Sequence, residues 1–465
     1  MALEVVVLAA GMGTRMRSAI PKVLHPIAGQ PMLAHVLAAA ATLHPERIHV
    51  VVGSGQDQVR AVFGTAFNGA PLNWVAQLSQ RGTGDAVLQA LPHFAAGNRV
   101  LVLYGDVPLI APESLAALCR GVPHADLGVM TAVMADPSGL GRILRDAGGQ
   151  IRGVREERDA SPAERQIQEI NTGIMLAPAE RLGQWLPRLK PDNTQKELYL
   201  TDIVALAVAD GVAVTSSAPG QVEETGGIND RTQLAAAERI WQRRVAQRLL
   251  DTGVTLLDPL RIDVRGDLQA GPDSTIDVNV VFEGRVVLGT GVRVGAHCFI
   301  RDAVLGDNCV VEPNTFIDGA RLGNHVRVGP FARLRPGTEL ADHVRIGNFV
   351  ETKKARLGVG AKASHLAYLG DTDIGGGSNI GAGTITCNYD GISKHRTEIG
   401  KDVFVGSNAT LVAPLTLEDG AFVAAGSTIT SKVPAGGLAV GRGRQRNIEG
   451  WVRPDQRPGA ADDDD

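Results

Sequence analysis

Two groups of polar residues, one in each half of the 465-residue chain, have types and spacing that suit chemistry. The first group follows an apolar run that ends at Ala10, and it contains Gly11, Gly13, Arg15 and Lys22. Glycines let backbone N–H groups approach phosphate oxygens, and a helix start just beyond them favours negative charge. Two nearby cations strengthen that preference. The segment therefore predicts a polyphosphate site, although the two glycines alone would equally suit a tight turn between a strand and a helix.

The second group lies around residue 365 and combines a histidine with four cations. His365 could take a proton from an amine near neutral pH, because imidazole titrates in that range. The cations lie among repeats whose interior should be apolar, so they must face outward: Arg333, Arg335, Lys353 and Lys354. Together they could bind a sugar phosphate. From these residues alone, a structural histidine and a solvated basic face are the alternative interpretations.

The first group needs the edge of a sheet to position it. Residues 4–10, 48–52 and 100–104 are short apolar runs that predict buried strands, and residues 31–41 and 84–91 between them carry helix formers. Strands that alternate with helices predict a parallel sheet with covering helices. Ligands of such sheets bind beyond the carboxyl ends of the strands. We therefore expect chemistry directly after the first and the third of these strands.

The second half repeats an aliphatic residue every six positions, often followed by glycine. The longest run occupies residues 399–429, and similar runs begin at Leu288, Leu305 and Leu322. A period of six fits neither a helix nor a simple alternating strand, and it is the signature of a parallel β-helix. We expect each aliphatic side chain to point into the coil and each glycine to allow the bend. The gap at residues 387–398 predicts a loop outside the coil.

A helical segment separates the two halves. Residues 230–253 carry apolar positions at helical spacing among Arg, Gln and Glu residues, with Thr232 placed to cap the start and Gly253 the end. The predicted parts of the chain are an α/β domain, a linker helix, a β-helix and a disordered tail, at residues 1–229, 230–253, 254–451 and 452–465.

Composition and charge exclude several classes of protein. Lys plus Arg is 46 and Asp plus Glu is 50, and this net charge of −4 argues against general nucleic-acid binding. Aromatic residues make up only 4% and glycine 56 of 465 residues, which suits a solenoid. No apolar run approaches the ~18 residues that a membrane span needs, and the first strand has no basic leader that would indicate a signal peptide. The four cysteines form no CxxC pair, which favours a reducing, cytoplasmic location.

The first group resembles the nucleotidyltransferases that make nucleotide sugars, through residues 8–16 and 21–24. Met12 stands where many relatives carry lysine. The resemblance implies that the uracil meets Gln77 and the Gly82 loop. The full set of nucleotide-sugar contacts that it implies is Leu8, Ala9, Ala10, Gly11, Lys22, Gln77, Gly82, Thr83, Tyr104, Gly105, Asp106, Gly141, Glu156, Asn171 and Asn229, of which Gly141, Glu156 and Asn171 hold the sugar.

The same resemblance implies a metal site and a reaction. Asp106 and Asn229 match metal ligands, and one carboxylate with one carbonyl oxygen suits Mg²⁺, which keeps waters and takes substrate phosphates. The alternative for Asp106 is a residue that merely forms a turn. The implied reaction is attack of a sugar 1-phosphate oxygen on the α-phosphorus of a nucleoside triphosphate, with loss of pyrophosphate. Positioning and charge neutralisation do most of this work, with Arg15 assigned to the pyrophosphate and Lys22 to the phosphate oxygens.

The second group resembles the left-handed β-helix acyltransferases, and residues 362–371 resemble the segment around the catalytic base of the glucosamine-1-phosphate acetyltransferases. The resemblance implies that His365 is the base, that Glu351 could orient it, and that Tyr389 or Ser407 lies near an oxyanion donor. Cys387 is the alternative nucleophile, but direct transfer needs no covalent intermediate. The implied glucosamine-phosphate contacts are Arg335, Lys353, Tyr368 and Asn379. The implied acetyl-CoA contacts are Ala382, Asn388, Tyr389, Ser407, Ala425 and Arg442.

Both halves, in this order, resemble the bacterial bifunctional enzymes that make UDP-N-acetylglucosamine, over residues 3–452. The implied fold is an α/β Rossmann-like nucleotidyltransferase domain followed by an all-β left-handed parallel β-helix of hexapeptide repeats. The implied activities are acetyl transfer from acetyl-CoA to glucosamine 1-phosphate and Mg²⁺-dependent uridylyl transfer from UTP to N-acetylglucosamine 1-phosphate. The resemblance also implies a cytoplasmic homotrimer with these small-molecule substrates and no nucleic-acid or membrane partner.

Two rival interpretations make the chain an enzyme of one activity. In the first, the β-helix only assembles the protein, and His365 with Asn388 and Tyr389 argues against this. In the second, the first half only senses a nucleotide sugar, and Asp106 with Arg15 and Asn229 argues against that.

Overall fold

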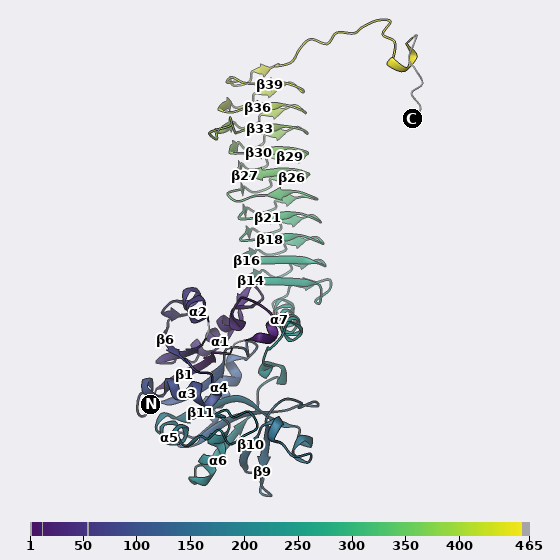
Figure 1. The fold of residues 1–465 in the computed structure, drawn as a ribbon. Coiled ribbons are helices and arrows are strands. Elements are labelled where there is room, and N and C mark those ends of the chain that lie inside the picture. The colour runs from purple at the N-terminus through teal and green to yellow at the C-terminus, as the bar shows by residue number, and fades with distance from the viewer. Residues whose placement is uncertain (1, 12, 54, 458–465) are drawn as a thin grey trace. The chain divides into compact units, whose positions relative to one another are not determined.

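The computed structural model describes residues 2–11, 13–53 and 55–457. Met12 and residues 458–465 of the predicted tail lie outside the described residues, whereas residues 452–457 are exposed and include a short turn of 3-10 helix, η8 (Pro454–Gln456). Contacts between Cα atoms divide the chain into two compact units, Met1–Arg248 with Asp263–Gly266, and Leu249–Ile262 with Asp267–Asp465. Figure 1 shows the elements of each unit.

The first unit is built on a mixed sheet with strand order β10-β9-β11-β7-β1-β4-β6-β5, in which β8 also pairs with β11 and β12. Its strands are β1 (Leu3–Ala9), β4 (Arg47–Val52), β5 (Ala66–Phe67), β6 (Ala70–Ala76), β7 (Arg99–Tyr104), β8 (Leu127–Val133), β9 (Arg142–Arg145), β10 (Ile151–Arg155), β11 (Glu169–Pro178) and β12 (Val214–Ser217). A separate hairpin consists of β2 (Pro26–Ile27) and β3 (Gln30–Pro31).

The prediction of a parallel sheet is confirmed in one half of this sheet and wrong in the other. Strands β7, β1, β4 and β6 run parallel, with Leu8 opposite Tyr104. Strand β11 runs antiparallel to β7, β8 and β9. The reason is that β9 and β10 are joined by a tight turn at residues 146–150 without a helix, and a chain that returns directly must pair antiparallel.

Helices cover both faces of this sheet. Side chains of β1 alternate, so that Val5 and Val7 enter one buried cluster with α1 and α4, while Val6 and Leu8 enter another with α3 and α6. The predicted helices at 31–41 and 84–91 are confirmed as α1 and α3. The helices are α1 (Met32–Ala41), α2 (Gln56–Phe63), α3 (Thr83–Ala90), α4 (Pro112–Gly121), α5 (Ala179–Trp185) and α6 (Asp202–Ala209), with 3-10 turns η1 (Thr14–Met16), η2 (Lys22–Leu24), η3 (Leu91–His93), η4 (Glu157–Asp159), η5 (Glu164–Gln166), η6 (Leu186–Arg188) and η7 (Val222–Thr225).

The predicted helix at residues 230–253 is α7 (Arg231–Asp251). Its cap differs from the prediction, because the Asp230 side chain accepts a hydrogen bond from the Gln233 backbone N–H at 2.9 Å, so Asp230 rather than Thr232 caps the start. Gly253 follows the helix with φ +86°, as the prediction of a glycine stop requires. Across the described residues, no helix combines the length and apolar character needed to cross a membrane.

The second unit is a parallel β-helix in which each strand pairs with the strand one coil before and one coil after (Figure 1). One ladder comprises β13 (Thr255–Leu256), β15 (Thr275–Ile276), β17 (Arg293–Val294), β20 (Val310–Val311), β23 (Arg327–Val328), β26 (Arg345–Asn348), β29 (Lys362–His365), β32 (Asn379–Ile380), β35 (Phe404–Val405), β38 (Phe422–Val423) and β40 (Leu438–Ala439).

The remaining strands form the other sides of the coil. They are β14 (Ile262–Ala270), β16 (Val280–Leu288), β18 (Phe299–Arg301), β19 (Val304–Leu305), β21 (Phe316–Asp318), β22 (Arg321–Leu322), β24 (Arg333–Leu334), β25 (Glu339–Leu340), β27 (Glu351–Lys353), β28 (Arg356–Leu357), β30 (Tyr368–Gly370), β31 (Thr372–Ile374), β33 (Ile385–Cys387), β34 (Thr397–Ile399), β36 (Thr410–Val412), β37 (Leu415–Leu417) and β39 (Thr428–Ile429).

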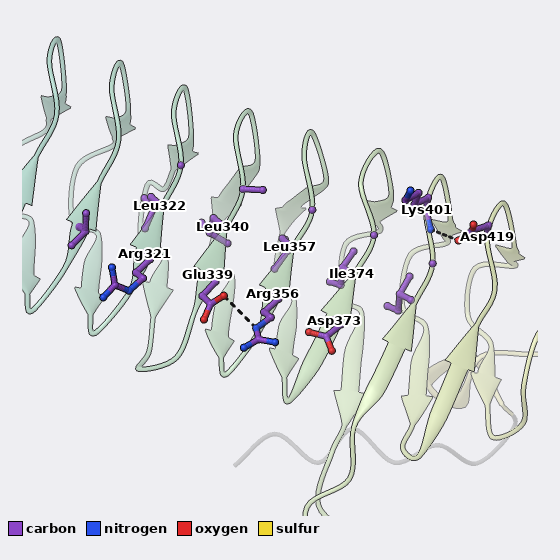
Figure 2. A pocket seen from close by; sticks show the side chains of 17 residues that line it. Arg321, Leu322, Glu339, Leu340, Arg356, Leu357, Asp373, Ile374, Lys401 and Asp419 are labelled. Carbon is purple, nitrogen blue, oxygen red and sulfur yellow. Dashed lines mark hydrogen bonds and ion pairs between the residues drawn. The ribbon is translucent and has the colours of Figure 1, made fainter.

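The six-residue period fills the interior of the coil as predicted. Figure 2 shows Leu322 and Leu340 stacked on one side of their strands while Arg321 and Glu339 point to the other. The aliphatic residues at the repeat positions are buried throughout residues 288–429. The predicted excursion is also confirmed, because β33 ends at Cys387 and β34 begins only at Thr397.

The glycines serve a purpose beyond the bend. A Cβ on Gly347 would lie 1.8 Å from the backbone oxygen of Ser364 in the next coil. Such corners stack so closely that a side chain has no space there.

We expect Ile346→Ala to destabilise the β-helix by about 2–5 kcal/mol, because Ile346 is fully buried and its removal leaves a cavity between coils. Differential scanning calorimetry of the full chain should show a lower unfolding temperature for the β-helix. The matched control is Arg345→Ala on the same strand, whose side chain is exposed and should matter by less than about 0.5 kcal/mol. Equal effects of the two changes would contradict the inward orientation of Ile346.

Candidate functional site

The first candidate site lies at the carboxyl ends of three parallel strands, β7, β1 and β6, of which β7 and β1 are neighbours and β4 separates β1 from β6. A pocket of about 390 Å³ opens there. Ten of the predicted nucleotide-sugar residues line it: Leu8, Ala9, Ala10, Gly11, Lys22, Gln77, Gly82, Thr83, Tyr104 and Asp106. Val23, Gln80, Ala86 and Glu197 complete the lining and were not predicted. The carboxyl edge of the sheet thus brings together residues such as Leu8 and Asp106, which are nearly 100 positions apart in sequence.

Lys22 lies between the two predicted metal ligands. Its ammonium donates to the Asp106 carboxylate and, at 3.3 Å, to Oδ1 of Asn229. The Lys22 and Asp106 side chains are mostly buried, with exposed fractions of 11% and 19%. The loop that carries Asn229 is held in place because the Ile228 backbone N–H donates to the backbone oxygen of Asp106 at 2.9 Å. The two side-chain oxygens therefore converge on a point that accommodates a cation.

This pair of oxygens fits the predicted Mg²⁺. Within the described part of the chain, no three His, Cys, Asp or Glu side chains are placed to hold a metal ion together. Mg²⁺ does not need such a cage, because it is commonly bound by one or two protein oxygens, waters and substrate phosphates. Asp106 and Asn229 supply the protein oxygens, and the adjacent pocket has room for the phosphates.

The segment between β6 and α3, predicted to meet the uracil, forms one side of the pocket. The Gln77 amide donates to the Asp85 carboxylate at 2.8 Å and to the backbone oxygen of Gly82 at 3.2 Å. These bonds direct the Gln77 carbonyl oxygen to other donors. Gly82 has φ +111°, and a Cβ there would lie 2.6 Å from the backbone oxygen of Leu198. The loop therefore requires glycine at this position for both conformation and space.

The three predicted sugar contacts form a separate cluster that does not line the 390 Å³ pocket. The Asn171 backbone N–H donates to the backbone oxygen of Gly141 at 2.8 Å, and the Thr201 hydroxyl donates to Glu156 at 2.9 Å. Burial raises the pKa of the Glu156 carboxyl. Oδ1 of Asn171 is buried and has no hydrogen-bond partner among the described residues. An orphaned acceptor of this kind costs about 1–3 kcal/mol unless a ligand satisfies it.

Tyr104 joins the sugar cluster to the pocket. Burial raises the pKa of its hydroxyl above the ordinary range, and the charges of the Glu156 and Asp106 carboxylates act in the same direction. Its ring also approaches Gly173, where a Cβ would come within 2.6 Å of it. The phenol is therefore neutral and spans the distance between the metal ligands and the sugar contacts.

Two further predicted residues take different positions. Arg15, in η1, is exposed and forms no hydrogen bond or ion pair with any described residue, so its guanidinium is available to a ligand. Gly105 does not line the pocket, because it packs beneath it, where a Cβ would lie 3.2 Å from the Cβ of Ala9.

The second candidate site is a hollow of about 430 Å³ on the β-helix. Its lining is Ser364, His365, Asn379, Ile380, Gly381, Ala382, Phe404, Gly406, Ser407, Phe422 and Ala425, which includes five of the predicted residues. The hollow lies along the ends of β29, β32, β35 and β38.

Strand register places the reactive residues in one column. Ala363, Ile380, Val405 and Val423 are partners in successive coils. Two residues beyond these partners lie His365, Ala382, Ser407 and Ala425. Adjacent strands are about 4.8 Å apart, so the column presents an imidazole followed by three small residues. The small residues leave the hollow open beside the imidazole.

The orientation of His365 differs from the prediction. Its Nδ1 lies 2.6 Å from Oδ1 of Asn348, which is its register partner in the preceding coil. Glu351, which was predicted to orient His365, instead accepts a hydrogen bond from Arg335 at 2.8 Å. Coil length explains the difference. The residue that pairs with His365 in the preceding coil lies 17 positions earlier, at Asn348, whereas Glu351 lies only 14 positions earlier.

The predicted phosphate-binding cations lie on the neighbouring side of the coil and do not line the hollow. Arg335 pairs with Glu351, and Lys353 lies 3.8 Å from the Asp371 carboxylate. Sequence reasoning missed Lys394 in the excursion. The nearby Lys353 ammonium lowers the pKa of Lys394, because two like charges repel each other. One feature of the sequence could have identified Lys394: it is a lysine in a loop that interrupts the hexapeptide repeat soon after His365.

The remaining predicted contacts have partners of their own. Tyr368 in β30 packs so closely on its own strand that a Cβ on Gly370 would lie 2.5 Å from its hydroxyl. Asn388 donates to the Asp371 carboxylate, Tyr389 is exposed, and Arg442 donates to the backbone oxygen of Ala425 at 2.8 Å. Of the other predicted cations, Arg333 lies over the Phe316 ring, 5.9 Å from its centroid.

Comparison with known proteins identifies relatives of both units. The MobA-like NTP transferase domain matches residues 5–166, the GMPPB C-terminal domain matches 264–363, and the hexapeptide repeat of succinyl-transferase matches 396–431. Three similar proteins are each named Bifunctional protein GlmU. That of Stutzerimonas stutzeri is 55% identical over 457 residues (98% of this chain and 100% of the relative). That of Alkalilimnicola ehrlichii is 54% identical over 459 residues (98% of each chain), and that of Pseudomonas entomophila is 53% identical over 456 residues (98% and 99%).

We expect Gly82→Ala to weaken the binding of UDP-N-acetylglucosamine about tenfold or more, because the added methyl group must displace the backbone at Leu198. Isothermal titration calorimetry on the full chain measures this. The matched control is Gly97→Ala, which also has positive φ (+81°) but open space around it. It carries the conformational strain alone, about 1–2 kcal/mol of stability, and should keep the affinity. Unchanged affinity in Gly82→Ala would exclude this loop from the ligand site.

Proposed function

The chain belongs to the family of bifunctional GlmU proteins, and on this premise we propose how its residues perform the two reactions. The protein is a bifunctional enzyme that transfers acetyl from acetyl-CoA to glucosamine 1-phosphate and then uridylyl from UTP to N-acetylglucosamine 1-phosphate. Its architecture is a nucleotidyltransferase domain followed by a left-handed β-helix of hexapeptide repeats. The observation that carries the assignment of residues is that each unit contains its own pocket, one beside Lys22 and one beside His365.

In the first unit, the residues position phosphates and neutralise their charge. Backbone N–H groups around Gly11 cradle the phosphates of UTP, Lys22 contacts the phosphate oxygens, and Arg15 stabilises the departing pyrophosphate. Asp106 and Asn229 would hold Mg²⁺, which supplies positive charge to the phosphates. An oxygen of the sugar 1-phosphate forms a bond to the α-phosphorus as the bond to pyrophosphate breaks.

Recognition of the base and sugar follows from fixed polar groups. The Gln77 amide donates to Asp85, so its carbonyl oxygen accepts the N–H of uracil. Oδ1 of Asn171 is buried without a partner among the described residues, so it accepts a hydrogen bond from the sugar. Glu156 adds a second contact beside it, supported by Thr201. A sugar without the matching donor would leave Asn171 unsatisfied, which gives selectivity.

In the second unit, His365 acts as general base. Its free nitrogen takes a proton from the amine of glucosamine 1-phosphate while the amine nitrogen attacks the thioester carbonyl carbon. The developing oxyanion is stabilised by a donor at Ser407 or Tyr389. The carbon–sulfur bond then breaks, and the coenzyme A sulfur leaves with the proton that His365 holds. Ala382, Ala425, Asn388, Tyr389 and Arg442 bind acetyl-CoA, and Asn379 binds the sugar phosphate.

The phosphate of glucosamine 1-phosphate is bound by Arg335, which directly follows β24, by Lys353 in β27 and by Tyr368 in β30. We add Lys394, because it lies close enough to Lys353 for the two charges to lower the pKa of Lys394. Two adjacent ammonium groups repel each other, and a dianionic phosphate between them removes that cost.

We also propose a homotrimer in the cytoplasm. The predicted contacts Arg335, Lys353 and Arg442 do not line the hollow that contains His365, which supports a site completed by a neighbouring copy of the chain. Sulfur chemistry supports the location, because the four cysteines, all of them described, are free thiols.

We expect His365→Ala to abolish acetyl transfer and to leave uridylyl transfer unchanged, and Asp106→Ala to do the reverse. The reason is that the two pockets lie in separate units. Each reaction is measured separately with full-length protein, by formation of N-acetylglucosamine 1-phosphate or of UDP-N-acetylglucosamine. Loss of both activities in either variant would contradict the division of roles.

Mixtures that omit one component each give the matching control with the unaltered protein. With glucosamine 1-phosphate, acetyl-CoA, UTP and Mg²⁺, mass spectrometry should detect UDP-N-acetylglucosamine, and without UTP only N-acetylglucosamine 1-phosphate. If glucosamine 1-phosphate stays unchanged while N-acetylglucosamine 1-phosphate still reacts with UTP, the roles assigned to the second unit fail.

A further inference from the structure

We propose that Asn348 is a positioning residue for acetyl transfer, which fixes the proton on Nδ1 of His365 and leaves Nε2 as the base. This inference rests on the proposed role of His365. The observation that motivates it is the 2.6 Å separation between Oδ1 of Asn348 and Nδ1 of His365.

The contact is built into the coil. Strands β26 and β29 pair in parallel, with Arg345 opposite Lys362 and Asn348 opposite His365. The backbone oxygen of Asn348 also accepts a hydrogen bond from the N–H of Leu366 at 3.0 Å, so the backbone is fixed directly beyond the imidazole. Half-buried Asn348 thus presents its amide to the ring from the coil before.

The chemistry of the two side chains sets the proton. An amide oxygen can only accept, so Nδ1 must carry the hydrogen when it bonds to Oδ1. Nε2 of neutral His365 then keeps its lone pair and can accept a proton from the substrate amine. When Nε2 is protonated, the dipole of the Asn348 carbonyl faces the positive ring and stabilises it. Both effects favour proton removal at one defined atom.

The other neighbours of His365 leave this role to Asn348. On the opposite side, in the next coil, the column continues with Ala382, which has no polar side-chain atom. Glu351 accepts a hydrogen bond from Arg335 at 2.8 Å. Without the amide oxygen, the imidazole would populate both tautomers and rotate, and only a fraction would point its lone pair at the amine.

The test uses full-length protein and steady-state kinetics of acetyl transfer. We expect Asn348→Ala to lower kcat by about tenfold or more, the usual scale for a group that orients a catalytic imidazole. The KM values for glucosamine 1-phosphate and acetyl-CoA should stay within about twofold, because Asn348 contacts the base and not the substrates. Asn348→Asp keeps an acceptor at the same place, so it should restore kcat to within about threefold of the unaltered enzyme.

Two control variants, Asn324→Ala and His365→Ala, distinguish a failure of this inference from a failure of the proposed function. Asn324→Ala removes an amide oxygen elsewhere in the β-helix, far in sequence from His365. That oxygen accepts a hydrogen bond from the backbone N–H of Asp307 at 2.8 Å. It should keep kcat for acetyl transfer, and all variants should keep uridylyl transfer. His365→Ala reports on the proposed function itself.

Each remaining outcome overturns one statement. If His365→Ala still transfers acetyl, the proposed role of His365 fails and the inference fails with it. If His365→Ala is inactive but Asn348→Ala has normal kcat, only the inference fails. A rise in KM at normal kcat would make Asn348 a substrate contact, and equal losses in Asn348→Ala and Asn348→Asp would show that the hydrogen-bond acceptor is not what matters.

Discussion

Both sites depend on the pairing of parallel strands. Parallel pairing makes neighbouring strands end at the same edge and keeps residues at equal offsets side by side. In the first unit it brings the ends of β1, β6 and β7 together, so that Gly11, Gln77 and Asp106 line one pocket. In the second unit it repeats coil after coil and produces the column from Asn348 to Ala425. The backbone ladder therefore determines which side chains meet, and the side chains determine the chemistry.

The cations that we propose as phosphate ligands are held differently in the two units. In the first, Lys22 is held by oxygens of Asp106 and Asn229, so its charge is balanced within the protein before a ligand arrives. In the second, the charges of Lys353 and Lys394 repel each other beside the Asp371 carboxylate, which lies 3.8 Å from Lys353. The first arrangement suits the exchange of one cation for another around a triphosphate. The second leaves excess positive charge for a small dianion.

Much of the fold was predictable because it depends on local periodicity. The six-residue period identified the buried ladder, and apolar runs identified β1, β4 and β7. The antiparallel half of the first sheet was not predicted, although the turn between β9 and β10 contains the pair Gly148 and Gly149, which is typical of hairpins. The cap of α7 was also misassigned, because Asp230 and Thr232 are both good cap residues.

The site residues that could be predicted are likewise those that belong to a local sequence motif. Residues in contiguous motifs, such as Gly11 and Lys22, were found in the pocket as predicted. Asn348 was not found, because a spatial neighbour in a solenoid lies one coil away and the length of that coil, here 17 residues, has to be known. Lys394 was missed because its loop lies outside the repeat.

The close stacking of the coils, as at Gly347 and Ser364, has a consequence for how such a chain can change over evolutionary time. Gain or loss of a whole coil preserves the pattern of strand pairing, so the solenoid can change length in steps of one coil. Between Arg335 and Ala425, however, one step would shift His365, the proposed base, against the other proposed contacts by a strand spacing of about 4.8 Å. The proposed acetyl transfer therefore fixes the number of coils in that stretch, whereas the number before Arg335 is constrained by the fold alone.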